Sequence, residues 1–350
     1  MTDWQDQLKN AITSAADLSA ALGCDQQQDW EEIEAVSVRY PLRIPPYYLE
    51  LIRKVGTPLY RQAVPDIREL DDPAGMVDPL GEERLSPVPN LVHKYPDRVL
   101  FLVSSQCAMY CRFCTRKRKV GRNTMRVSEA TIAAGLEYLR NTPQVREVLI
   151  SGGDPLLLSD AQLEDILQRL RGIGHIEVIR IGTRAPCTLP MRVTPELAAM
   201  LRQYHPLYIN THFNHPAEIT PEAEQACALL ADAGIPLGCQ TVLLKGVNDT
   251  PEVMQELLYK LLRSRVRPYY LMQADLTKGT NHFRTDISTG LVIMRSLIGT
   301  VSGMAVPTYV LDAPDGRGKI PLTPEYITSL QGDTLEFLNY QGIPCSYPLP

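Results

Sequence analysis

Short apolar runs alternate with amphipathic helical patterns over most of the chain after residue 97. The runs are rich in branched and aromatic residues, which is typical of strands buried in a parallel sheet; they lie at residues 98–105, 146–155, 176–186, 207–216, 236–246 and 267–275. Between them, apolar residues recur every three or four positions, as on one face of a helix, at residues 128–141, 159–172, 194–205, 220–234 and 250–264. This alternation predicts six βα units with the helices outside the sheet.

The length of this region indicates whether the sheet can close into a complete barrel. A complete eight-stranded barrel usually takes about 250 residues, and the repeating region is shorter. We therefore expect an α/β fold in which the units form a partial (βα)6 barrel of the TIM type, with a doubly wound open sheet as the alternative. A further apolar run at residues 305–314 is expected to close the mouth of the barrel.

The first 95 residues have a different pattern. Helical spacing predicts one amphipathic helix over residues 3–23 and a second that begins after Pro45 and ends at Gly56. Residues 77–97 contain four prolines and are expected to form a loop. We therefore divide the chain into a helical N-terminal region (1–95), the barrel (96–312) and a short C-terminal segment (313–350).

Composition and charge exclude several classes of partner. The chain has 350 residues, of which 44% are hydrophobic and 21% charged, as in globular proteins. A net charge of −5 gives no electrostatic reason to expect nucleic acid or an anionic membrane. The sequence shows neither a signal peptide nor an apolar stretch of the roughly 20 residues that cross a membrane. We expect a cytoplasmic protein that can form a homo-oligomer.

Polar residues and glycines follow the predicted strands at their carboxyl ends. Ligands bind at this edge of parallel α/β sheets, so the candidate site lies at the top of the barrel. The residues concerned are Ser104, Ser105, Gln106, Ser151, Gly152, Gly153, Asp154, Thr183, Arg184, Asn210, His212, Asn214, Gln240 and Asp275.

Three cysteines, Cys107, Cys111 and Cys114, follow the first predicted strand with the spacing C-x3-C-x2-C. Their many polar neighbours argue against three buried core residues, and zinc usually takes four ligands. Three thiolates on a four-iron cluster leave one iron open to a reactant. The spacing therefore favours a 4Fe-4S cluster. The other five cysteines are expected to be small buried hydrophobic residues: Cys24, Cys187, Cys227, Cys239 and Cys345.

The cysteine motif and two further stretches of the sequence resemble a known protein family. The cysteine motif after the first strand resembles the radical S-adenosylmethionine superfamily. Together, residues 97–118 (DRVLFLVSSQCAMYCRFCTRKR), 149–156 (LISGGDPL) and 306–319 (VPTYVLDAPDGRGK) resemble the lysine 2,3-aminomutase family, and the resemblance covers about residues 44–321. It implies an isomerase that uses a 5′-deoxyadenosyl radical to move the α-amino group of L-lysine to the β-carbon. The implied cofactors are the cluster, S-adenosyl-L-methionine and pyridoxal 5′-phosphate, and a reductant for the cluster is an implied partner.

The resemblance also implies roles for individual residues. Lys319 would be the catalytic lysine that binds pyridoxal phosphate as a Schiff base, and Tyr95 and Arg98 would hold its phosphate. Arg116 would bind the substrate α-carboxylate, while Asp275 and Asp312 would hold the ε-ammonium, because a buried ammonium needs opposite charge. The residues that would surround S-adenosylmethionine are Ser151, Gly152, Gly153, Asp154, His212 and Gln240. The other cations around the cysteines are expected to be solvated: Arg112, Lys117, Arg118 and Lys119.

This chain departs from the family pattern at some positions. Asp315 and Arg317 stand where the family more often has glycines, and Lys94 stands where some relatives carry arginine. Thr250 replaces one ligand of a structural zinc that some members bind, so we expect no zinc.

Several alternatives remain open. They are an aminomutase for arginine or glutamate, the branch that supplies β-lysine for modification of elongation factor P, a radical enzyme without pyridoxal phosphate, and an iron–sulfur electron-transfer protein. The last would be expected to carry a fourth cysteine ligand.

Overall fold

The computed structural model describes residues 3–23, 29–122 and 124–349. Within these residues, nine strands form one sheet in which each strand lies beside the next in chain order. β2 to β8 run parallel, while β1 and β9 are antiparallel strands at the two edges. The strands are β1 (Leu91–Tyr95), β2 (Arg98–Ser104), β3 (Glu147–Gly152), β4 (Val178–Gly182), β5 (Leu207–Thr211), β6 (Leu237–Leu243), β7 (Val266–Gln273), β8 (Thr308–Ala313) and β9 (Gly318–Pro321).

The six predicted strands are confirmed as β2 to β7, and the predicted α/β barrel-like architecture is confirmed with them. The run at residues 305–314 was expected at the mouth. Instead it forms β8, which pairs in parallel with β7 and extends the barrel wall.

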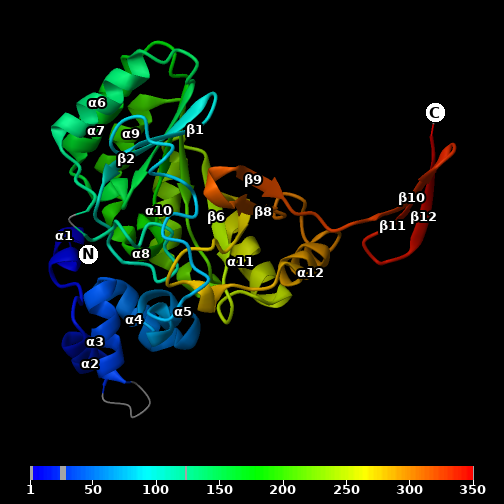
Figure 1. The fold of residues 1–350 in the computed structure, drawn as a ribbon, viewed down its shortest axis with the longest axis horizontal. Coiled ribbons are helices and arrows are strands. Elements are labelled where there is room, and N and C mark those ends of the chain that lie inside the picture. The colour runs from blue at the N-terminus through cyan, green and yellow to red at the C-terminus, as the bar shows by residue number, and fades with distance from the viewer. Residues whose placement is uncertain (1–2, 24–28, 123, 350) are drawn as a thin grey trace.

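Helices cover the outer face of this sheet (Figure 1). The five predicted helices are confirmed, and each begins after a Ser or Thr whose side-chain oxygen accepts a hydrogen bond from a backbone N–H in the first turn. They are α6 (Glu129–Arg140), α7 (Asp160–Arg171), α9 (Pro195–Leu201), α10 (Pro221–Asp232) and α11 (Pro251–Arg263), joined by α12 (Ile287–Leu297) before β8 and by the short α8 (Ala185–Thr188).

Burial alternates along the strands, as expected when one face packs under helices. In β3, β4 and β6 every second residue is buried, and these residues share one hydrophobic core with the helices. The alternate residues are mostly half-buried and face the inside of the curved sheet. Small and polar side chains can therefore line the interior without the cost of full desolvation.

The two edges of the sheet approach each other, so the barrel is nearly closed. Lys94 of β1 reaches across to Asp312 of β8, with 3.5 Å between Nζ and Oδ1. A Cβ placed on Gly318 of β9 would lie 3.9 Å from the Tyr95 hydroxyl of β1. We call this junction of β1 with β8 and β9 the seam.

The N-terminal helices form a layer beside the barrel (Figure 1). They are α1 (Trp4–Lys9), α2 (Ala15–Leu22), α3 (Trp30–Arg39), α4 (Pro46–Val55) and α5 (Thr57–Ala63). The helix predicted after Pro45 is confirmed as α4, but the prediction of a single helix over residues 3–23 is wrong. Ile12 instead exchanges two backbone hydrogen bonds with Ile44, which separates α1 from α2. The loop predicted over residues 77–97 also contains β1.

Beyond β9, residues 327–348 of the C-terminal segment form a second sheet, which projects from the body as an arm (Figure 1). Its strands are β10 (Ile327–Gln331), β11 (Thr334–Leu338) and β12 (Pro344–Pro348). The division of the chain at 95/96 and 312/313 stays a prediction, and the hairpins β1–β2 and β8–β9 span both positions. Among the helices of the described residues, none has both the length and the hydropathy that a membrane span requires.

The scattered cysteines are mostly core residues. Cys187, Cys227 and Cys239 are buried as expected, whereas Cys345 in the arm is partly exposed, because β12 has no helix packed over it. Cys24 lies outside the described residues.

Candidate active site

The loop after β2 brings the three motif cysteines around one space. Cys107, Cys111 and Cys114 all line a cavity of about 40 Å³. Burial raises the pKa of the Cys107 thiol, and it raises the pKa of Cys114 to about 11. No group of three Cys, His, Asp or Glu side chains in the described parts of the chain is arranged to hold a single metal ion. A four-iron cluster differs because each thiolate binds its own iron, and three cysteines bordering a shared space fit that requirement.

A buried ion cluster ties this loop to the N-terminal region. Glu69, at the end of a 3-10 turn (Ile67–Glu69), accepts hydrogen bonds from Arg112 Nε at 2.8 Å and Lys117 Nζ at 2.8 Å. All three side chains are at most 6% exposed. The prediction that Arg112 and Lys117 are solvated is therefore wrong, because both are buried and pair with the same carboxylate. Arg118 and Lys119 are also largely enclosed, and they pair with acids of residues 78–83.

The glycine stretch after β3 packs on the start of the cysteine loop. A Cβ on Gly152 would lie 2.2 Å from Ser104 O, and one on Gly153 would lie 2.3 Å from Gln106 O. The backbone N–H of Gly153 donates to Ser104 O, and that of Asp154 donates to Gln106 O. Glycine is therefore required here for close backbone approach.

Asp154 and Ser151 differ in their surroundings. Both carboxylate oxygens of Asp154 already accept hydrogen bonds, from the Thr183 hydroxyl and from the backbone N–H groups of Leu156 and Arg184. Asp154 thus holds the ends of β3 and β4 together. Ser151 is half-buried on the inner face of β3.

His212 and Gln240 are the other residues expected near S-adenosylmethionine; His212 directly follows β5, and Gln240 lies in the neighbouring β6. Burial, assisted by the charge of Arg184, lowers the pKa of His212 to about 3, so its ring is neutral. The ring contacts Phe113 of the cysteine loop at 5.4 Å between centroids, and it hydrogen-bonds Asn214. The prediction that Gln240 follows its strand is wrong: it lies in the middle of β6, on the half-buried inner face, because β6 continues to Leu243.

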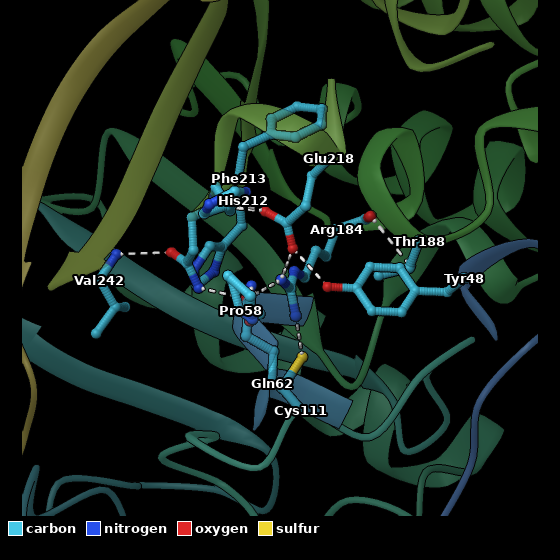
Figure 2. A network of polar contacts seen from close by, with 12 residues as sticks. Tyr48, Pro58, Gln62, Cys111, Arg184, Thr188, His212, Phe213, Glu218 and Val242 are labelled. Carbon is cyan, nitrogen blue, oxygen red and sulfur yellow. Dashed lines mark hydrogen bonds and ion pairs between the residues drawn. The ribbon is translucent and has the colours of Figure 1, made fainter. Parts of the chain in front are cut away.

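A polar network lies against the cysteine loop, as Figure 2 shows. At its centre is Arg184, which follows β4. Its guanidinium donates to Cys111 Sγ at 2.8 Å, to Gln62 Oε1 at 2.7 Å and to Glu218 Oε1 at 2.8 Å. Sequence reasoning noted Arg184 as a polar strand-end residue but gave it no role, and its partners come from α5 and from the turn after β5.

Arg116 is paired with a residue that sequence reasoning missed. Its Nε donates to Glu82 Oε1 at 2.8 Å, and its Nη1 points to Gly152 O at 3.5 Å. Glu82 is 2% exposed although it lies in the predicted loop. Nothing in the local pattern distinguishes it from its exposed neighbour Glu83.

Lys319 lies at the seam, opposite Asp312 in the β8–β9 register. Its Nζ forms an ion pair with Asp312 Oδ2, while Lys94 approaches the other oxygen. Burial first, and then the charge of Asp312, raise the pKa of Asp275 to about 7. The structure thus brings together both predicted substrate carboxylates and the predicted catalytic lysine.

The residues expected to hold a phosphate also lie at the seam. The Arg98 guanidinium lies 4.2 Å from the centroid of the Tyr95 ring, and Tyr95 lies beside Gly318, the neighbour of Lys319. The turn before Gly318 contains Asp315, whose φ of +59° is in the left-handed region. The Asp315 N–H donates to Pro79 O at 2.9 Å, which holds this residue in a conformation that glycine adopts more easily.

Comparisons with known proteins give the family. The family model described as "Lysine-2,3-aminomutase" matches residues 294–350. The model described as "Radical SAM superfamily" matches residues 101–258. The chain is 48% identical to an L-lysine 2,3-aminomutase of Fusobacterium nucleatum and 50% identical to one of Methanococcus maripaludis, over 99% of this chain and 82% of each relative. It is 44% identical to a glutamate 2,3-aminomutase of Clostridioides difficile, over 97% of this chain and 82% of that relative. This chain therefore belongs to the lysine 2,3-aminomutase family of isomerases within the radical S-adenosylmethionine superfamily.

Proposed function

We propose that this protein converts L-lysine to β-lysine by moving the amino group from the α-carbon to the β-carbon. Membership of the superfamily implies an iron–sulfur cluster and S-adenosylmethionine, and we assign the cluster to Cys107, Cys111 and Cys114. The observation that carries the choice of lysine is the pair of carboxylates beside Lys319. One of them, Asp312, holds an alkylammonium group in this structure, that of Lys319 itself.

The same carboxylates suit the ε-ammonium of a substrate. When the Lys319 amine is committed to pyridoxal phosphate, Asp312 loses this partner and can receive another ammonium of the same chemistry. Lys94 then remains the cation beside two buried carboxylates, so the ammonium of a lysine side chain stabilises the site. Glutamate would instead bring a third carboxylate beside Asp275 and Asp312, and neighbouring like charges repel.

Arg116 suits the other end of the substrate. Glu82 occupies the Nε side of the guanidinium, which leaves the Nη1 side directed toward the carboxyl end of β3. A guanidinium binds a carboxylate through two parallel N–H groups. The substrate would then lie between Arg116 and the two aspartates.

The residues at the seam fit pyridoxal phosphate. The Lys319 side chain is 29% exposed, so its amine can be reached, and the nearest described atom to a Cβ on Gly318 is 3.9 Å away. Arg98 and Lys94 supply positive charge for a phosphate. When bound, pyridoxal phosphate supplies an aldehyde that carries the migrating amino group, while the one-electron chemistry comes from the cluster with S-adenosylmethionine. The chain binds and orients the amino acid and excludes water.

The direct test is anaerobic incubation of the reconstituted protein with L-lysine, L-arginine or L-glutamate, followed by chromatography of the β-isomers. We expect β-lysine alone. Asp312→Asn and Arg116→Ala should each lower kcat/KM for lysine by about 100-fold or more, as expected when one partner of a buried charge contact is removed. Lys319→Ala should lose the absorbance band of lysine-bound pyridoxal phosphate.

Glu83→Gln is the control. The Glu83 side chain is 63% exposed, so this substitution should leave activity unchanged. Formation of β-glutamate or β-arginine in place of β-lysine would contradict the substrate assignment. An unchanged kcat/KM in Asp312→Asn would contradict the role of the carboxylates.

A further inference from the structure

The guanidinium of Arg184 is aimed at a cluster cysteine by three elements of the fold (Figure 2). Nη1 donates to Cys111 Sγ at 2.8 Å, while Nη2 donates to both Gln62 and Glu218. The side chain is 10% exposed. We propose that Arg184 raises the reduction potential of the cluster through its hydrogen bond to the Cys111 thiolate. This inference rests on the proposed function, because it takes Cys111 as a cluster ligand.

The direction of Arg184 is fixed by its partners. Glu218 is fully buried, and its carboxylate also accepts hydrogen bonds from the Tyr48 hydroxyl at 2.6 Å and from the Asn214 backbone N–H at 2.7 Å. These donors prevent the carboxylate from turning away. Gln62 Oε1 is held in turn by the Asn214 side chain at 3.0 Å.

The base of the side chain and its flat face are held as well. The Arg184 backbone N–H donates to Asp154 Oδ2 at 2.8 Å. The guanidinium carbon lies 5.1 Å from the centroid of the Phe113 ring, and Phe113 stands between Cys111 and Cys114 in the motif. These contacts hold the guanidinium with Nη1 directed toward the sulfur.

The sign of the effect follows from the arrangement of charge. The reduced cluster is the more negative state, so a cation and an N–H donor at a ligand sulfur stabilise it and raise the potential. Arg184 touches the sulfur directly, whereas Glu218 lies on the other side of the guanidinium. His212 adds no charge here because its ring is neutral. The charged group in direct contact with the Cys111 sulfur is therefore the Arg184 cation, even though the Arg184–Glu218 pair is neutral.

A purely structural ion pair is the competing interpretation. Arg184 acts through Cys111, so it is a positioning residue, and a structural pair would affect folding without changing the potential. The two interpretations separate when both charges are removed together. The double variant Arg184→Gln/Glu218→Gln keeps the net charge and leaves no buried unpaired ion, which favours folding.

The experiment is a redox titration of the reconstituted full-length protein, followed by electron paramagnetic resonance in the absence of S-adenosylmethionine. We expect the equilibrium constant for one-electron reduction of the cluster to be about tenfold or more lower in the double variant. A tenfold decrease corresponds to a midpoint potential about 59 mV more negative. Arg184→Lys keeps the charge but loses the planar fork, and it should give a smaller shift in the same direction.

The matched control is Arg180→Gln/Glu147→Gln. This pair joins β3 to β4, and it lies four residues earlier along β4 than Arg184, roughly 13 Å further from the edge. It should leave the midpoint unchanged. If the Arg184/Glu218 variant does not fold, Arg184→Lys decides the question.

The outcomes separate this inference from the proposed function. An unchanged midpoint in a variant with full iron content would overturn the role of Arg184 and leave the cluster assignment intact. A parent protein that assembles no cluster, or a Cys111→Ala variant that keeps the parent's cluster signal, would overturn the cluster assignment itself.

Discussion

Ionisation at the seam depends on neighbours that are distant in the sequence. Asp275 follows β7, Asp312 lies in β8 and Lys319 lies in β9, and the fold places all three together. Burial and the charge of Asp312 raise the pKa of Asp275 to about 7, although Lys319 and Lys94 oppose the shift. Carboxyl groups that titrate near neutral pH are typical of functional sites.

This shift predicts a pH-dependent stability. The pKa of Asp275 in the folded protein, about 7, is above the value of about 3.9 for an unfolded aspartate. The folded state therefore binds more protons, and the stability contributed at low pH is lost as the pH rises from about 4 through 7. Asp275→Asn should leave the free energy of unfolding nearly unchanged at pH 4 and raise it by at least about 1 kcal/mol at pH 8.

Urea unfolding of the cofactor-free protein at pH 4, 6 and 8 measures this difference, with the exposed Asp71 as the control in Asp71→Asn. A difference between variant and parent that stays constant with pH would contradict the shifted pKa of Asp275.

The partners of the charged residues could not be predicted from the sequence. The cations after Cys111 were visible in the sequence, but their partners were not. Glu69, Glu82 and Glu218 are buried acids that hold Arg112, Arg116 and Arg184. No local pattern identifies them, because each ion pair joins segments more than 30 positions apart.

Elements of secondary structure were more predictable than their contacts. The helices after β2 to β6 begin where Ser or Thr precedes an amphipathic pattern, since both the cap and the periodicity are local properties. The prediction of one helix over residues 3–23 was wrong because a non-local contact interrupts the pattern. Their spacing suits one helix, but the hydrogen bonds between Ile12 and Ile44 are non-local.

The turn before Lys319 is an element whose conformation depends on close packing. Gly316 has a φ of +71°, and a Cβ there would lie 2.6 Å from Leu80 O. Gly316→Ala should therefore destabilise the protein by at least about 1–2 kcal/mol, the cost of a left-handed alanine. It should also weaken binding of pyridoxal phosphate by displacing Lys319.

Thermal unfolding and titration with pyridoxal phosphate measure these two effects. Gly303→Ala is the matched control, because no atom of the described residues lies within 4 Å of a Cβ at Gly303. Equal unfolding temperatures and equal affinities for pyridoxal phosphate in the two variants would show that the turn is not tightly packed.

The whole molecule combines a nearly closed barrel, a layer of N-terminal helices and a projecting arm (Figure 1). The seam is a structural consequence of this shape. Because β1 and β9 lie at opposite edges of the sheet, curvature brings Lys94 and Tyr95 next to Lys319. Residues from the beginning and the end of the sheet thus meet at one site.

This architecture predicts how protection from hydrogen exchange is distributed. Strands β3 to β6 have a neighbour on each side and helices over their buried face, so their amides should exchange slowest. The arm shares no strand with the barrel within the described residues, so the amides of β10 to β12 should exchange fastest. Hydrogen exchange followed by mass spectrometry of peptic fragments measures this. Protection of the arm equal to that of β5 would contradict the separation of the two sheets.

The sequence by itself determined the order of the elements, the parallel sheet and the family motifs, because periodicity, caps and motif spacing are written within short stretches. Tertiary structure alone decided which buried acid each cation meets, that β8 continues the barrel wall, and that Lys319 lies opposite Asp312 beside Tyr95. These contacts depend on how strands curve and where their edges meet, and a periodic pattern records only which face of an element is buried.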